Sequence, residues 1–187
     1  METAVYGLTE FYREEIKKAH LVANPGCYPT AALLALAPLL STQTKSINSI
    51  VIDAKSGVSG AGRKKTESLS FSELNENFKA YKVLDHQHTP EIEYYLSKIA
   101  QKKWPIDFVP HLLPVKHGIL ETIYVRLNSS MTLNKIHQMY SRFYKTEKFV
   151  RILAKGKQVE LKHVVGTNYC DISLVLSKTG KLVVITA

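Results

Sequence analysis

Cys27 lies between a turn and an apolar helical segment, in the stretch NPGCYPTAALLALAPLL. Asn24, Pro25 and Gly26 are turn formers, and Pro29 suits the first position of the Ala- and Leu-rich helix that follows. This order predicts that the sulfur meets the unpaired backbone N–H groups at the start of the helix, where the helix dipole favours a thiolate. We therefore predict a nucleophile at Cys27, with a small buried thiol as the alternative interpretation.

A second group of reactive side chains lies in the stretch DHQHTPEI. If the residues before Thr89 are extended, His86 and His88 project to the same side. The positive end of the helix that follows favours a neutral imidazole, which is the form that can take a proton from a thiol. Glu91 lies in the first turn of that helix, where its negative charge interacts favourably with the helix dipole. It could also orient an imidazole.

These residues alone leave three interpretations of His86 and His88 open: a general base, an exposed polar loop before a capped helix, and a metal site. Two histidines one residue apart fix no metal geometry by themselves. The remaining chemical groups fit structural roles better. Cys170 lies in a strand-like run, and His111, His117 and His163 are flanked by apolar or basic residues.

A glycine-rich stretch, KSGVSGAGRKK, follows an apolar run at residues 47–54. Its glycines do not have the GxGxxG spacing, and basic residues rather than an apolar helix come after them. The stretch is therefore a weak signal for a phosphate-binding loop. It predicts a turn that brings the backbone close to another group.

The elements that must position these residues mix helices and strands without strict alternation, which predicts an α+β domain with helices packed on one broad mixed β-sheet. We expect a helix from the capping residue Thr9 to about His20, and another after Pro29. Further helices are expected at 89–102, with Thr89 as cap, and from Thr132 to 145. Strands are expected at 47–54, 78–84, 106–115, 118–127, 149–153, 169–176 and 181–187, with 106–115 and 118–127 as a hairpin-like pair.

The composition is that of an ordinary globular protein, with 187 residues, 45% hydrophobic side chains and a formal net charge of +9. Two cysteines form no disulfide framework, and no secretory signal is visible, which predicts a cytoplasmic protein. The longest apolar run, residues 31–40, is too short to cross a bilayer. Basic residues are dispersed without an arginine–aromatic pattern, so we expect no nucleic-acid partner and no membrane partner. The charge fits a solvated surface or the attraction of anionic metabolites.

Four stretches together carry a family resemblance: NPGCYPTA, KSGVSGAGR, DHQHTPEI and GTNYCDI. In this order, with VYGLTE ahead of them and PHLLPVKHGILETIYV between them, the sequence resembles the N-acetyl-γ-glutamyl-phosphate reductases, NADPH-dependent enzymes of arginine biosynthesis. The resemblance covers essentially the whole chain, but the chain covers only part of the family protein. It implies one catalytic and subunit-contacting domain, residues 1–187, without the N-terminal Rossmann domain and the C-terminal helical return.

The resemblance also implies roles for individual residues. Cys27 would be the nucleophile, and His86 and His88 would lie in the active site, with one of them as the acid/base. Ser59 and Gly60 would lie nearest the nicotinamide of NADPH. Three residues are assigned to the substrate, namely Asn24 at the oxyanion, Arg63 at an anionic group, and Glu91.

The implied partners are a small acyl phosphate and further copies of the chain in a homo-oligomer, with no metal. Because the hydride donor's site lies mostly on the absent domain, we expect this polypeptide alone to be inactive with NADPH. Two alternatives remain: a reductase of a related acyl phosphate, aminoadipyl or aspartyl, and a cysteine hydrolase or acyltransferase without a cofactor.

Overall fold

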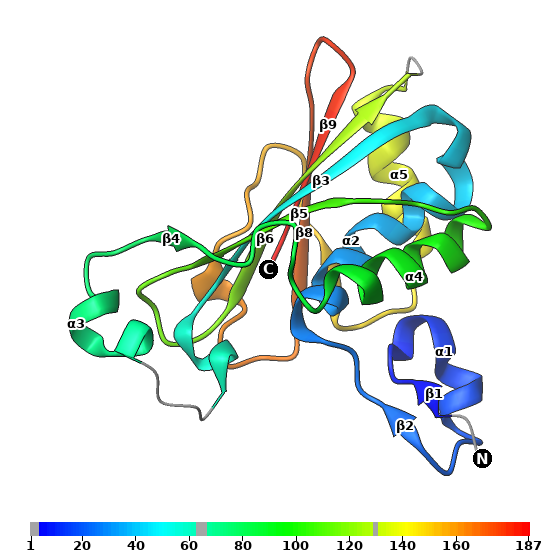
Figure 1. Cartoon of the computed structure of the whole chain (residues 1–187). Helices are drawn as coiled ribbons and strands as arrows, with labels where there is room; N and C mark the ends of the chain where they lie inside the picture. Colours follow the sequence, from blue (N-terminus) through cyan, green and yellow to red (C-terminus); the bar gives the residue numbers. More distant parts are fainter. Residues whose placement is uncertain (1–3, 63–66, 129–130) are drawn as a thin grey trace.

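The chain folds around one seven-stranded mixed β-sheet with the strand order β4-β5-β3-β6-β9-β8-β7. The structure is a computed structural model that describes residues 4–62, 67–128 and 131–187. Figure 1 shows α2, α4 and α5 gathered on one side of this sheet. The predicted α+β class, with helices on a broad mixed sheet, is confirmed.

The strands of the main sheet are β3 (Ile47–Ser56), β4 (Lys79–Ala80), β5 (Asp107–Leu112), β6 (Ile119–Leu127), β7 (Val150–Ile152), β8 (Cys170–Leu176) and β9 (Lys181–Thr186). The main helices are α2 (Cys27–Gln43), α4 (Thr89–Ala100) and α5 (Leu133–Phe143), and α3 (Phe71–Leu74) is a single turn. Short 3-10 turns occupy Thr44–Ser46, Val58–Ala61, Glu67–Leu69 and Leu161–His163. No helix in the described ranges combines the length and apolar character needed to span a bilayer.

The longest strand, β3, lies between β5 and β6 and pairs with both, parallel to β5 and antiparallel to β6. The predicted hairpin-like pairing of 106–115 with 118–127 is therefore wrong. The two runs do form strands, but β3 lies between them and takes the hydrogen bonds of both. Buried residues alternate along β3 and β6, so one face of the sheet packs against the helices.

The N-terminal segment forms a small unit outside the main sheet. β1 (Val5–Tyr6) pairs in parallel with β2 (Val22–Ala23), and α1 (Thr9–Ile16) connects them. In Figure 1 this unit lies apart from the sheet, below α4, and Tyr6 of β1 stacks on Tyr95 of α4. The chain passes from β2 directly into the turn before α2.

The predicted helices exist, but three of them begin earlier than the sequence suggested. The residues that flank α1 and α4 on their N-terminal side are Leu8 and His88, so Thr9 and Thr89 are the first helical residues rather than side-chain caps. Helix α2 begins at Cys27, so Pro29 occupies its third position, where a missing N–H is equally harmless. The predicted strand 78–84 is reduced to Lys79–Ala80, because positive backbone φ angles at Lys82 and Leu84 turn the chain. By contrast, the Thr132 side chain accepts a hydrogen bond from the Lys135 N–H, as a cap should.

Pro38 lies in the middle of α2, where it cannot donate the hydrogen bond that the carbonyl of Leu34 would normally receive. The hydroxyl of Tyr144 donates to this carbonyl at 2.5 Å. The neighbouring Tyr140 hydroxyl donates to the carbonyl of Ala35 at 2.7 Å. Two tyrosines at the end of α5 thus join this helix to α2, and one of them supplies the donor that the proline removes.

This geometry predicts that Tyr144→Phe lowers the free energy of unfolding by about 1 to 3 kcal/mol, because a buried carbonyl loses its donor. The loss should shrink in a Pro38→Ala background, where the alanine N–H can donate to Leu34 instead. Urea unfolding of the wild type, both single variants and the double variant measures this coupling. Equal losses in the two backgrounds would contradict it.

Candidate active site

Cys27 is the first residue of α2, and no side chain caps this end of the helix. The backbone N–H groups of Cys27 and Tyr28 donate hydrogen bonds to the sulfur and lower the pKa of the thiol. Cys27 is an exposed residue, but partial removal of its thiol from water raises the pKa and is the largest effect. The carboxylates of Glu121 and Glu91, when ionised, also raise it. The pKa of Cys27 is therefore raised. The predicted contact with the helix start is present, but the predicted preference for a thiolate is wrong for this chain.

The carboxylate of Glu91 connects the residue before Cys27 with the imidazole of His88. Its Oε1 accepts hydrogen bonds from the Gly26 N–H at 2.9 Å and from the Tyr6 hydroxyl at 2.8 Å. Its Oε2 lies 2.9 Å from Nδ1 of His88. Both oxygens are thus engaged by protein groups. This arrangement fits the orienting role of Glu91 better than the substrate contact that the resemblance implied.

His86 is buried and electrically neutral at physiological pH. Burial first, then His88 and Lys82, lower the pKa of His86 to about 4. Its Nδ1 accepts a hydrogen bond from the backbone N–H of His88 at 3.1 Å, which leaves the ring proton on Nε2. The predicted neutral imidazole is present, although burial rather than the helix dipole is its main cause.

The two imidazoles lie close together, with ring centroids 5.2 Å apart, but the segment before Thr89 is a turn, with His88 in αR conformation, rather than the extended chain that the prediction assumed. They differ in what remains available for chemistry. His88 donates from Nδ1 to a carboxylate, which leaves Nε2 as a proton acceptor. This ring also packs against Gly26, where a Cβ atom would lie 2.9 Å from Nε2 and 2.3 Å from Cε1. The Cε1–Nδ1 edge of the His88 ring therefore lies closest to Gly26, with the Cβ position 2.6 Å from Nδ1, and Gly26 leaves room for the ring by having no side chain.

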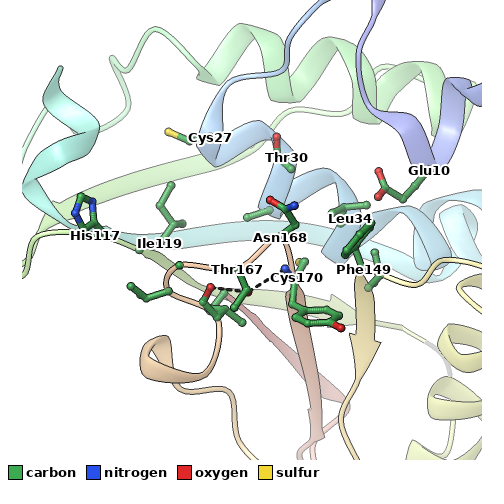
Figure 2. A pocket seen from close by; sticks show the side chains of 18 residues that line it. Glu10, Cys27, Thr30, Leu34, His117, Ile119, Phe149, Thr167, Asn168 and Cys170 are labelled. Carbon is green, nitrogen blue, oxygen red and sulfur yellow. Dashed lines mark hydrogen bonds between the residues drawn. The ribbon is translucent and has the colours of Figure 1, made fainter. Parts of the chain in front are cut away.

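Cys27 borders two cavities. The histidine cavity, of about 470 Å³, is lined by Cys27, His86 and His88 together with Gly60 and other residues. The Asn168 cavity, of about 390 Å³, is lined by Cys27, His117, Phe149 and Asn168 among others. Figure 2 shows Cys27 and His117 at one end of the Asn168 cavity, and Glu10 and Phe149 at the other. Cys27 thus lies between the two cavities.

The histidine cavity combines positive charge with phenolic hydroxyls. Lys79 and Lys82 line it, and so do Tyr28 and Tyr81, whose hydroxyl oxygens lie 2.9 Å apart. The backbone of Lys82 has a φ of 43°, a conformation uncommon for a side chain other than glycine. A strained residue beside a reactive cysteine is a frequent feature of functional sites. The wall of the cavity is suited to an anionic ligand.

The glycine-rich stretch lies beside the site and approaches the loop before β6. Backbone N–H groups of Gly57 and Ser59 donate to the carbonyls of Gly118 and Lys116 at 2.9 and 3.0 Å. Gly60 lines the histidine cavity, whereas the hydroxyl of Ser59 lies 2.9 Å from Nδ1 of His117. The predicted close backbone approach is confirmed, and its partner is this loop.

Two further predicted contacts are not found at the cavities. Asn24 is exposed and lines neither of them. Arg63 lies outside the described residues. The predicted oxyanion contact of Asn24 therefore has no support from the described geometry.

Glu121 was missed in the sequence, although its position carried a signal. It alternates with Ile123, Val125 and Leu127 on the buried face of β6, and its side chain is fully buried. Neither carboxylate oxygen has a hydrogen-bond partner, and burial raises the pKa of Glu121 well above its ordinary value. Its charge would raise the pKa of Cys27, so a neutral Glu121 favours reaction at the sulfur.

The other reactive side chains have largely structural surroundings. Cys170 lies in β8 with its sulfur 3.1 Å from the Thr186 hydroxyl, and burial raises the pKa of its thiol to about 12. Nδ1 of His111 contacts Asp53 and the carbonyl of Ala54. His117, predicted to be structural, instead lines the Asn168 cavity. Within the described ranges, no three His, Cys, Asp or Glu side chains are grouped to hold a metal ion.

The sequence of the chain is similar to those of known proteins. Residues 27–187 match the family model described as semialdehyde dehydrogenase, dimerisation domain. A protein of Pelotomaculum thermopropionicum named N-acetyl-gamma-glutamyl-phosphate reductase is 53% identical over 185 residues, which cover 98% of this chain and 53% of that relative. A Bacillus subtilis protein of the same name is 46% identical over 187 residues, covering 100% of this chain and 54% of the relative. The chain thus spans about half the length of the curated relatives it matches.

Solved structures of low sequence identity share the fold. Aspartate semialdehyde dehydrogenase from Francisella tularensis has a TM-score of 0.73 at 14% identity, over 98% of this chain and 65% of that one. Aspartate semialdehyde dehydrogenase II from Vibrio cholerae has a TM-score of 0.70 at 13% identity, over 98% of this chain and 61% of that one.

The raised pKa of Cys27 predicts slow alkylation by iodoacetamide at pH 7, slower than that of a small unhindered thiol. The rate should increase about tenfold per pH unit up to the pKa of the thiol, because only the thiolate reacts. Cys170 should react more slowly still, since the pKa of its thiol is raised to about 12. Peptide mapping by mass spectrometry separates the two sites, and a Cys27 rate above that of the free thiol at pH 7 would contradict this prediction.

The unpartnered carboxyl of Glu121 predicts a pH-dependent loss of stability. Its pKa is higher in the folded than in the unfolded chain, so rising pH favours unfolding once the unfolded carboxyl ionises. Glu121→Gln removes this effect, and its stability relative to the wild type should grow by up to about 1.4 kcal/mol per pH unit between pH 5 and 7.

Urea unfolding at several pH values measures this difference. Glu14→Gln, at an exposed carboxylate paired with Lys17, is the matched control and should show little change over the same range. A difference for Glu121→Gln that stays constant with pH would show that its carboxyl is not held neutral.

Proposed function

The chain belongs to the family of semialdehyde dehydrogenase dimerisation domains, and we propose that it is the catalytic domain of an NADPH-dependent N-acetyl-γ-glutamyl-phosphate reductase. The observation that supports this proposal best is that Cys27 and His88 line the same cavity, with the imidazole of His88 held by Glu91. The two relatives named N-acetyl-gamma-glutamyl-phosphate reductase are 53% and 46% identical in sequence to this chain, over 98% and 100% of its length. The proposed reaction converts the acyl phosphate to a semialdehyde and inorganic phosphate in arginine biosynthesis.

In the proposed first step, Nε2 of His88 takes the proton of the Cys27 thiol while the sulfur attacks the acyl carbon. The C–O bond to phosphate breaks, and a thioester on Cys27 remains. Because the thiol is held protonated in the resting chain, a base beside it is required. Glu91 holds the Nδ1–H of His88 and stabilises the imidazolium that forms, whereas the neutral His86 fixes the backbone of the same loop.

The anionic substrate fits the charge of the histidine cavity. Lys79 and Lys82 line its wall and would attract the phosphate and carboxylate groups of an acyl phosphate. In this proposal the two lysine ammonium groups stabilise the negative charge of the bound acyl phosphate. They replace the Arg63 and Asn24 contacts as the better-supported substrate contacts within the described residues.

The Asn168 cavity fits the nicotinamide end of the cofactor. Apolar and aromatic groups such as Ile119 and Phe149 line it beside Cys27, and the Asn168 side chain offers an amide to a planar amide-bearing ring. Bound there, NADPH would supply the hydride that reduces the thioester to the aldehyde level. As the C–S bond breaks and the aldehyde forms, His88 would return its proton to the leaving sulfur, which restores the Cys27 thiol. Gly60 lines the histidine cavity instead, and Ser59 contacts His117 but does not line the Asn168 cavity itself. The predicted cofactor contact of both residues is therefore less direct.

The N-terminal unit supports the proposal that residues 1–187 form one domain of a larger enzyme. β1 and β2 are two-residue parallel strands, and a parallel pair of this size is not stable by itself. Leu21 and Val22 beside this pair expose 55% and 40% of their surface. We expect these strands to join the sheet of a nucleotide-binding domain in the complete polypeptide. The proposed location of the reaction is the cytoplasm.

The face of the main sheet that points away from the helices suits a second copy of the chain. Val51 and Val109 are partly exposed there, and Tyr124 and Val175 expose 39% and 40% of their surface. An apolar sheet face without covering helices is a common subunit contact. The matched family is described as a dimerisation domain, so we propose a homo-oligomer built on this face.

The first half-reaction can be tested on this chain without the cofactor. Incubation with N-acetyl-γ-glutamyl phosphate should give one equivalent of inorganic phosphate and a mass increase confined to the peptide of Cys27. Cys27→Ala should abolish both signals, and Cys170→Ala, the matched control, should leave them intact. NADPH should not be oxidised by this chain alone.

The outcomes separate the competing functions. Steady phosphate release beyond one equivalent would indicate a cofactor-free hydrolase, and a preference for aspartyl or aminoadipyl phosphate would indicate a reductase of another substrate. Absence of any Cys27 adduct with all three acyl phosphates would overturn the proposal.

A further inference from the structure

Tyr6 lies outside the main sheet and contacts Glu91, the carboxylate that holds His88. It belongs to β1 and is largely buried, with its ring stacked on Tyr95 of α4 at a centroid distance of 3.6 Å. Its hydroxyl donates to Oε1 of Glu91 at 2.8 Å. This is a long-range contact between a strand of the N-terminal unit and the first turn of the helix that follows the two histidines.

The two oxygens of Glu91 have different partners. Oε1 accepts from Tyr6 and from the N–H of Gly26, and Oε2 contacts His88. A carboxylate that receives two donors on one oxygen has less charge available for the other. It also has a defined orientation, since both donors belong to segments packed against it.

We infer that Tyr6 is a positioning residue, which acts through Glu91 to set the orientation and basicity of His88 and makes both depend on the placement of β1. This inference rests on the proposed role of His88 as the base. The contacts of β1 include its short pairing with β2, the aromatic contacts of Tyr6 to α1 and α4, and the hydrogen bond from Tyr6 to Glu91. A shift of the N-terminal unit would therefore change the donor set of Glu91 and, through it, the imidazole.

The charged and titratable groups around this contact come from several elements. Tyr95 of α4 and Cys27 of α2 face Glu91, whose charge raises the pKa of both. His86 and Tyr28 face the ring of His88 at centroid distances of 5.2 and 6.5 Å. Tyr6 differs from these groups because its hydroxyl couples the N-terminal unit to Glu91 by a hydrogen bond.

Tyr6→Phe tests the inference in this chain, because it removes the hydroxyl and keeps the stacked ring. The carboxylate then has one donor fewer and becomes a stronger acceptor for the imidazolium of His88. We expect the midpoint of the His88 titration, followed by NMR of the ring protons, to rise on the order of half a pH unit. Assignment uses the signal that disappears in His88→Asn.

Tyr95→Phe is the matched control, because it removes a hydroxyl from the stacked partner without touching the contact to Glu91. It should leave the His88 midpoint unchanged. Glu91→Gln should lower the midpoint by about one pH unit, which shows that Glu91 transmits the effect. An unchanged midpoint in Tyr6→Phe, or equal shifts in both tyrosine variants, would overturn the inference.

The result is separable from that of the proposed function. The NMR titration needs no substrate, so it stands even if no Cys27 adduct forms with any acyl phosphate. If adducts do form, the pH profile of their formation should shift in Tyr6→Phe in the same direction as the His88 midpoint. If Tyr6→Phe does not fold, Tyr6→Trp and the Glu91→Gln titration replace it, and an unshifted midpoint in both overturns the inference.

Discussion

The carboxylate of Glu91 holds together three segments that are far apart in the chain: the strand of Tyr6, the turn before Cys27 and the loop of His88. Each contact is an ordinary hydrogen bond, but their combination fixes the proposed nucleophile, Cys27, and the proposed base, His88, relative to one another. Gly26 contributes by having no side chain, since a Cβ atom would occupy the space of the imidazole. The packing of α2 against α4 would bring the elements together without Glu91, but it would not orient the reactive atoms.

The electrostatic balance at Cys27 differs from the simple case of a thiolate at a helix start. Two backbone N–H groups favour the anion, while burial, as the largest effect, and the carboxylate of Glu91 oppose it. The result is a thiol that keeps its proton until a substrate and a base are both in place. Such a thiol is protected from oxidation and alkylation, because these reactions need the thiolate. The cationic side chains of the histidine cavity act on the substrate rather than on the resting sulfur.

Much of the fold and part of the site could be predicted from the sequence. Strong local patterns worked: the Ala- and Leu-rich helix after Cys27, the alternating strands, and the pairing of His86 with His88 in space. Predictions that depended on long-range order did not, because the insertion of β3 between β5 and β6 has no local signature. The raised pKa of Cys27 and the separate environments of His86 and His88 also result from burial, which only the assembled fold defines. Glu121 was detectable by its place among apolar residues of one strand face, a signal that its charge obscured.

The position of Cys27 between two cavities has a consequence for the order of events. A covalent group on the sulfur would form part of a partition between two compartments, each with its own entrance. In the proposed reaction, inorganic phosphate could then diffuse away on one side while a nucleotide is exchanged on the other. Release of the first product and renewal of the reductant would not compete for one passage, which permits a ping-pong sequence as readily as an ordered one.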